Sequence, residues 1–319
     1  MKKQSKIGLA LGGGGARGLA HIGVVKVLER EGINPDIIVG TSMGSLVGGA
    51  LAIGLKAEEL EKQVFSFLET KLYKSSELRA VGDSERGNER TLSRRIQSYF
   101  KTKIRLVHGI YRLGILETKD IEELINFFIP DITIEETLIP FRAVATDLES
   151  GKPVILREGS LRRAILESSS VPGMLPYIEI DGRKLSDGGI IQSVPARSAV
   201  EEGANVVIAI AVDKDLGSVP VFHTAVDIYV RAAEIQGYYL ERHELKCADI
   251  VIRPELGDTH WTDFSNAQNL IFSGESAAMD KVSDIRGSVK HSPEKGFFAR
   301  VTKKIKELFV MEKRNCSGD

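Results

Sequence analysis

Strand-like segments alternate with helical segments along most of this 319-residue chain. The strand-like segments are residues 7–11, 36–40, 141–148, 152–158, 175–180, 204–212 and 249–254. Most of them are continuously apolar, which is typical of strands in a mostly parallel sheet with helices on both faces. The pattern predicts a three-layer α/β/α fold with a mostly parallel central sheet, in one domain that spans residues 5–290.

The first strand-like segment is followed directly by four consecutive glycines, residues 12–15. Gly13, Gly15 and Gly18 satisfy the pattern G-x-G-x-x-G between a strand and a helix, the setting in which a dinucleotide pyrophosphate binds. That kind of site also needs an acidic residue at the end of the second strand. Asp36 precedes its strand instead, so this alternative, a dinucleotide-binding oxidoreductase, is disfavoured.

A serine occupies the position where the dinucleotide site would need its acid. The sequence from Gly40 to Gly44 reads G-T-S-M-G between a strand and a helix, and G-x-S-x-G in that setting predicts a nucleophile elbow at Ser42. The alternative is a tight turn whose serine caps the helix. In a parallel sheet the glycine loop lies at the same edge as Ser42, where its N–H groups could stabilise a transient oxyanion by about 3–4 kcal/mol per donor.

A serine nucleophile needs a base that takes its proton. Of the six histidines, only His260 lies in a predicted loop without another evident role. Asp187, in the sequence L-S-D-G-G-I, is the better candidate, because a partly desolvated carboxylate in a tight turn has a raised pKa and is a stronger base. The alternative is an ordinary Asp-Gly turn.

The three motifs at 13–18, 40–44 and 187–189 resemble, in this order, those of the patatin-like phospholipase family. The blocks at 145–151 and 168–176 agree, and the resemblance covers residues 6–212 and is strongest to small bacterial members related to the neuropathy-target-esterase-like lysophospholipases. It implies a patatin-like fold and hydrolysis of lipid acyl esters by a Ser–Asp dyad, without histidine, metal or cofactor. Carried over by position, Ser42 is the nucleophile and Asp187 the base.

The same resemblance assigns the supporting positions. It implies that the N–H groups of Gly14, Gly15 and Ala16 form the oxyanion hole. Arg17 matches the basic position of the glycine motif, with solvent exposure in the first helical turn as its alternative role. The remaining motif positions are Gly13, Gly18, Gly40, Gly44, Gly188 and Gly189.

Charge and composition limit the classes of partner that can be expected for this chain. A net charge of −1 gives no reason to expect nucleic acid, and two cysteines are too few for a disulfide framework. No segment reads as a signal peptide or a membrane span. The sequence thus predicts a cytoplasmic protein whose partner is a lipid or ester substrate. A peripheral contact with the inner face of the membrane is a further expectation. A lipid-binding regulatory protein with a little-used dyad is the remaining alternative.

Two segments depart from the α/β pattern. Residues 71–112 contain eleven Lys or Arg against four acids, and this basic insertion is interpreted either as a lid or as a solvated surface excursion. In the tail, residues 291–319, a basic amphipathic helix is expected over 295–314. That helix would lie in a membrane interface or pack on the main domain.

Overall fold

The computed structural model describes residues 6–76, 79, 116, 118–213, 216–217 and 222–288. Eight strands in this part of the chain form one mixed sheet in the order β5-β6-β3-β2-β1-β7-β8, and β4 pairs with β3. The strands are β1 (Ile7–Leu11), β2 (Ile37–Thr41), β3 (Phe141–Asp147), β4 (Lys152–Leu156), β5 (Ile178–Ile180), β6 (Arg183–Asp187), β7 (Val206–Ile210) and β8 (Ile250–Ile252). The strands from β3 to β8 in this order pair in parallel, whereas β4 and β6 each pair antiparallel with β3, and β5 pairs antiparallel with β6.

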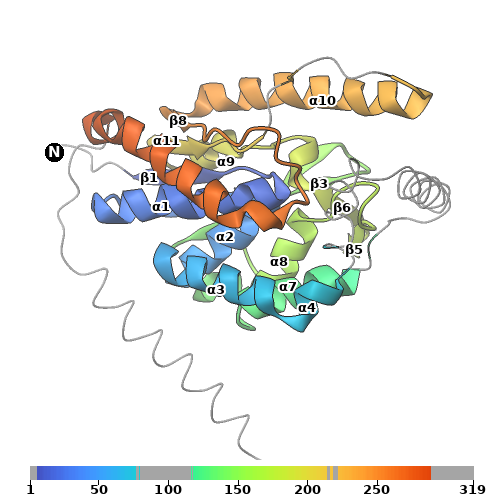
Figure 1. Ribbon diagram of the computed structural model, residues 1–319, viewed down its shortest axis with the longest axis horizontal. Coiled ribbons are helices and arrows are strands. Elements are labelled where there is room, and N and C mark those ends of the chain that lie inside the picture. The colour runs from blue at the N-terminus through green and yellow to red at the C-terminus, as the bar shows by residue number, and fades with distance from the viewer. Residues whose placement is uncertain are drawn as a thin grey trace, which may run out of the picture.

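Helices cover both faces of the sheet, which confirms the predicted α/β fold (Figure 1). One face packs against α1 (Ala20–Arg30), α2 (Met43–Ala52), α3 (Ala57–Glu69), α7 (Thr118–Phe128), α8 (Leu161–Ser168) and α11 (Ala267–Ser288). The other face packs against α9 (Ala196–Glu201) and the short η5 (Leu245–Cys247). In Figure 1 α10 (Ala225–Glu244) lies above α9, on the opposite side of the molecule from α3.

Alternate residues of β1 point into the two cores, as the pleat of a strand requires. Leu9 and Leu11 are buried beneath α1 and α2, and Ala10 is buried on the α9 side. All five residues of β1 are buried. The continuous apolar run in the sequence therefore reflects a central strand with no solvent-facing side.

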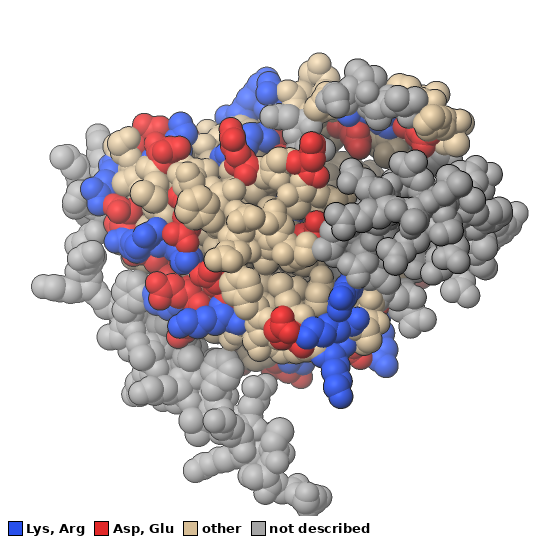
Figure 2. Space-filling model, viewed as in Figure 1, with Lys and Arg blue, Asp and Glu red and all other residues tan. Residues whose placement is uncertain are grey.

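Helix α11 crosses α1 at very short range, and this contact places the segment before α11 over the glycine loop. A methyl group added to Gly23 of α1 would lie 1.8 Å from the carbonyl oxygen of Ile271, and one added to Gly274 would lie 2.0 Å from that of Ala20. The outer side of α11 carries exposed Phe272 and Met279. On this face, charged side chains gather around a mainly uncharged central area (Figure 2).

The remaining described helices are α4 (Lys71–Ser75) and the short turns η1 (Gly15–Leu19), η3 (Ile134–Glu136), η4 (Gly188–Ile190) and η6 (Phe264–Asn266). No helix of the described ranges is long and apolar enough to cross a membrane. Most of the basic insertion at 71–112 and the whole tail at 291–319 lie outside the described residues, so their expected roles stay predictions.

Candidate active site

Ser42 lies in a sharp turn between the end of β2 and the start of α2. Its φ of 53° and ψ of −124° are rare for a residue with a side chain, and such a conformation costs about 1–3 kcal/mol. A methyl group on Gly40 would lie 2.4 Å from the carbonyl oxygen of Gly44, and one on Gly44 would lie 2.2 Å from that of Leu11. The two motif glycines are therefore required by close backbone contacts, and the turn has the geometry expected of a nucleophile elbow.

The backbone of Ser42 is held by a neighbouring serine. Its N–H donates to Oγ of Ser168 (3.0 Å), and the Ser168 hydroxyl donates to the carbonyl of Val144 in β3 (2.6 Å). Ser168 is fully buried at the end of α8. This chain of hydrogen bonds connects the strained turn to α8 and β3. The sequence motifs alone assigned no role to Ser168.

Asp187 is the last residue of β6 and immediately precedes η4. Its side chain is buried, and Oδ1 accepts a hydrogen bond from the N–H of Gly189 (2.7 Å). The other carboxyl oxygen, Oδ2, has no hydrogen-bond partner among the described residues. Burial raises the pKa of Asp187 to about 6, while the Gly189 N–H and the nearby Ser42 hydroxyl lower it and Asp213 raises it. The structure thus brings Ser42 and Asp187 together, with one carboxylate oxygen free of other hydrogen bonds.

The glycine loop passes beside Ser42. A methyl group on Gly13 would lie 3.3 Å from Cβ of Ser42. The N–H groups of Gly12 and Gly13 donate to the carbonyls of Ile210 and Ser193 (3.0 and 2.9 Å) and so anchor the start of the loop. In the described part of the chain, no hydrogen bond is donated by the N–H of Gly14 or Gly15. These two groups can serve as donors to an oxyanion.

The expectation for Ala16 needs correction. Its N–H donates to the carbonyl oxygen of Trp261 (2.6 Å), so in this conformation it is not free to meet an oxyanion. The cause is the segment before α11, which packs so closely that a methyl group on Gly15 would lie 2.2 Å from the same Trp261 oxygen. Gly15 also has a φ of +57°, which favours glycine. Nothing in the sequence around Trp261 indicated this contact.

Arg17 is not exposed to solvent, so the alternative role given to it from the sequence is wrong. Its side chain is only 12% exposed, and Nη2 forms an ion pair with Oδ1 of Asp213 (2.9 Å). Arg17 Nε also donates to the carbonyl of Gly14 (3.3 Å), and the hydroxyl of Ser193 donates to Oδ2 of Asp213 (2.6 Å). Arg17 therefore links the glycine loop to Asp213, which follows β7. Asp213 was missed, although its position just after a parallel strand is a signal for this edge of the sheet.

Two histidines lie near the loop, and neither has the setting of a catalytic base. His21 is fully buried, and because desolvation lowers its pKa to about 4, its ring is neutral and donates from Nε2 to the carbonyl of Gly12 (2.7 Å). Nδ1 of His260 lies 2.7 Å from the hydroxyl of Thr262, two residues further along. His21 thus fixes the glycine loop, and Asp187 is the buried group that faces Ser42.

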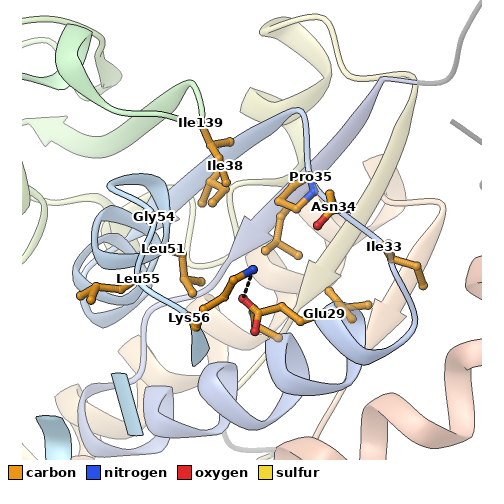
Figure 3. Close-up of a pocket in the computed structure, with 13 residues that line it drawn as sticks. Glu29, Ile33, Asn34, Pro35, Ile38, Leu51, Gly54, Leu55, Lys56 and Ile139 are labelled. Atoms are coloured by element: carbon orange, nitrogen blue, oxygen red, sulfur yellow. Dashed lines mark ion pairs between the residues drawn. The ribbon is translucent and has the colours of Figure 1, made fainter. Parts of the chain in front are cut away.

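Asp36 lies at the opposite edge of the sheet. Its Oδ2 accepts the N–H of Ile7 at the start of β1 (2.7 Å). A cavity lies at that edge, between α1, α2 and the loops that enter β2 and β3, and it encloses about 490 Å³ of space free of protein atoms, its mouth included (Figure 3). Glu29 and Lys56 form an ion pair of 3.9 Å at its rim. This cavity is remote from Ser42 and Asp187.

An apolar pocket opens beside Ser42. It encloses about 660 Å³ of space free of protein atoms, its mouth included, and apart from Gly15, Ser42 and Ser169 its described lining is apolar. The lining includes Leu116, Ile121, Ile125, Ile165, Leu175 and Trp261. In the described residues, no group of three or more His, Cys, Asp or Glu side chains is placed to hold a metal ion. The site combines a serine, a buried carboxylate, two backbone donors and an apolar surface.

The chain belongs to the patatin-like phospholipase family, whose model matches residues 9–200. This family is one of carboxylic ester hydrolases and supports lipid acyl hydrolysis in general. An uncharacterized NTE family protein of Mycobacterium tuberculosis is 34% identical over 208 residues, which are 65% of this chain and 49% of that protein. Patatin-like phospholipase domain-containing protein 6 of Homo sapiens is 30% identical over 257 residues, 79% of this chain and 16% of that protein.

The chain therefore spans about half the length of the mycobacterial relative and a much smaller part of the human one. Among solved structures, VipD from Legionella pneumophila aligns over 88% of this chain and 67% of that one, with 13% identity and a TM-score of 0.44.

Proposed function

We propose that this chain hydrolyses carboxylic esters of phospholipids or lysophospholipids through a dyad of Ser42 and Asp187. One observation carries the proposal: the hydroxyl of Ser42, in its strained turn, lies beside the buried carboxyl of Asp187, one oxygen of which has no hydrogen-bond partner among the described residues. The unused N–H groups of Gly14 and Gly15 lie on the neighbouring loop. A pocket with a mainly apolar lining opens at the same serine.

In the proposed first half-reaction, Ser42 Oγ attacks the ester carbonyl carbon while its proton passes to Asp187. The carbonyl oxygen becomes an oxyanion that accepts hydrogen bonds from Gly14 and Gly15. When the tetrahedral intermediate collapses, the C–O bond to the alcohol breaks, and the alcohol leaves with the proton from Asp187. In the second half, Asp187 takes a proton from water while the water oxygen attacks the acyl carbon on Ser42. Collapse of this intermediate breaks the bond to Ser42 Oγ, which takes the proton back from Asp187, and the fatty acid is released.

The position of Asp187 supports this role for a lone carboxylate. An ordinary aspartate has a pKa of about 4 and is a weak base, whereas burial raises the pKa of Asp187 to about 6. A base works best when its pKa approaches the working pH while it stays ionised.

The match to relatives such as lysophospholipase NTE1 of Scheffersomyces stipitis, 31% identical over 214 residues, makes single-chain phospholipids the first substrates to test.

The direct test is a hydrolysis panel on the purified protein, with phosphatidylcholine, lysophosphatidylcholine and simple fatty acyl esters as substrates. We expect release of free fatty acid from at least one phospholipid class and none from the Ser42→Ala variant. Fatty acid release that persists at the wild-type rate in Ser42→Ala would contradict the proposal.

The pH dependence follows from Asp187. Its base form exists above the folded-state pKa of about 6, so kcat/KM should be level above that pH and fall by about tenfold per unit below it. The measurement is a pH profile of kcat/KM with a neutral ester, which does not titrate itself. A plateau that continues down to pH values near the ordinary aspartate pKa of about 4 would contradict the assignment.

The dyad gives histidine no proton to transfer. His260→Ala is therefore expected to retain most of the wild-type kcat/KM, whereas loss of a triad member typically costs several powers of ten. Addition of a chelator should likewise leave the rate unchanged. A thousandfold loss in a folded His260→Ala variant would instead indicate a conventional triad.

A further inference from the structure

A second apolar cavity adjoins the pocket at Ser42. It holds about 420 Å³ of space free of protein atoms, its openings included, and every described side chain that lines it is apolar. These side chains come from η1, α1, α2, α3, α7 and η6. Among the described residues, four line both cavities and form the partition between them, namely Met43, Leu46, Leu124 and Phe264.

We propose that the two cavities together hold one long acyl chain. The carbons next to the ester lie in the pocket at Ser42, and the far end passes the partition into the second cavity. This inference rests on the proposed function and extends it to chain length: saturated or unsaturated long-chain acyl groups, rather than short ones, fill the site. The second cavity is then the subsite that selects for long chains.

The chemistry of the second cavity favours this occupant. Protein interiors are close-packed and contain few voids larger than a water molecule. A cavity with no polar partner for water stays dry and accepts apolar molecules instead. The lining around Val64, Phe67 and Phe128 offers only hydrocarbon surface, so an acyl chain is the part of a lipid that gains contacts there.

The partition is made of side chains, so the passage can open without any movement of the backbone. Leu46, Leu124 and Phe264 are each 7% exposed. Met43 is only partly buried and directly follows Ser42. Methionine is unbranched, with three rotatable bonds, and adapts to irregular space. Rotation of Met43 as an acyl chain enters is therefore the least costly way to join the two cavities.

The test fills the second cavity and leaves the first unchanged. Val64 of α3 lines only the second cavity and is 6% exposed. We expect Val64→Phe to lower kcat/KM for p-nitrophenyl palmitate at least tenfold, because each methylene excluded from apolar contact costs about fourfold. The same variant should hydrolyse p-nitrophenyl butyrate within about twofold of wild type, since a short chain never reaches the partition.

A matched control comes from the remote cavity at the other edge of the sheet (Figure 3). Val25 of α1 lines that cavity and is also 6% exposed. Val25→Phe adds the same bulk to the same helical layer and should leave the palmitate-to-butyrate ratio unchanged. Because overpacking can destabilise a core, Val64→Met provides a milder filling of the second cavity, and both Val64 variants are compared at a temperature where thermal unfolding shows them folded.

Each result has a defined meaning. A selective loss of palmitate hydrolysis in Val64→Phe or Val64→Met, absent in Val25→Phe, supports the two-cavity site. An unchanged ratio in folded Val64 variants means that the partition stays closed and that the chain ends in the first pocket, which overturns the inference while the proposed function stands. If wild type hydrolyses neither these esters nor any phospholipid of the panel, the proposed function itself fails.

Discussion

Replacing Asp187 with asparagine should abolish ester hydrolysis and, at neutral pH, stabilise the fold. Asparagine can keep the hydrogen bond from the Gly189 N–H to Oδ1 (2.7 Å), but its amide does not accept the Ser42 proton. We therefore expect kcat/KM to fall by several powers of ten, as it does when other enzymes lose a member of the nucleophile–base pair. Ser42→Ala should lose as much, and a double variant no more than either, because the two groups act as a unit.

The stabilisation follows from the raised pKa. Burial raises the folded-state pKa of Asp187 from about 4 to about 6. The stability that the neutral carboxyl contributes is fully present below about pH 4 and is lost as the pH rises through about 6. Asparagine stays neutral throughout. Asp187→Asn should therefore be more stable than wild type above pH 6, by up to about 3 kcal/mol, with no such advantage near pH 4.

Thermal unfolding at several pH values, together with the ester assay, checks both parts. A higher Tm at neutral pH together with an activity below the detection limit would show that the ionised Asp187 destabilises the fold but is needed for catalysis. If Asp187→Asn kept more than a few per cent of the activity, or lost stability at neutral pH, the role of Asp187 as a buried base would be contradicted.

Gly15→Val should reduce kcat by at least a hundredfold in a protein that still folds. Its Cβ would collide with the Trp261 carbonyl oxygen, 2.2 Å away, and the φ of +57° disfavours a branched residue. Either the loop or the Trp261 segment must move, and removal of one oxyanion donor costs about 2.7–4 kcal/mol. Because the donors act on the transition state, kcat should fall by a larger factor than KM rises.

Gly257→Val is the matched control for that variant. Gly257 has nearly the same φ, +56°, but nothing lies within 4 Å of an added Cβ. It therefore carries the same backbone strain without the collision, and its kcat should stay within about threefold of wild type. A rise in KM with an unchanged kcat in Gly15→Val would indicate a loop that binds the ground state of the substrate.

The parts of the fold that have a periodic or motif signature could be predicted from the sequence. β1 and the first three residues of β2 are apolar because both faces of each strand are buried, and this pattern predicted the parallel core. The turn at Ser42 could be predicted because its two glycines are required by contacts within a few residues or with the adjoining strand end. In both cases the constraint selects a residue type at the site itself, so it leaves a mark in the sequence.

The parts that depend on long-range packing could not be predicted in this way. The ion pair of Arg17 with Asp213 joins residues 196 positions apart. The carbonyl of Trp261 reaches the glycine loop only because α11 crosses α1 at short range, and a backbone carbonyl has no residue-specific signal. The adjoining cavities depend on how six elements pack together. Such features arise from tertiary contacts that the local pattern does not encode.

The most direct test of the Ser42–Asp187 dyad is covalent labelling with a fluorophosphonate, which reacts only with an activated serine. We predict one adduct, located by peptide mass spectrometry on Ser42, with labelling lost in Ser42→Ala and strongly slowed in Asp187→Asn. The same reagent separates a hydrolase from a lipid-binding regulatory protein with a little-used dyad, since the latter would label slowly or not at all. Wild-type protein that hydrolyses ester without an adduct on Ser42, or that carries its adduct on another serine, would contradict the dyad.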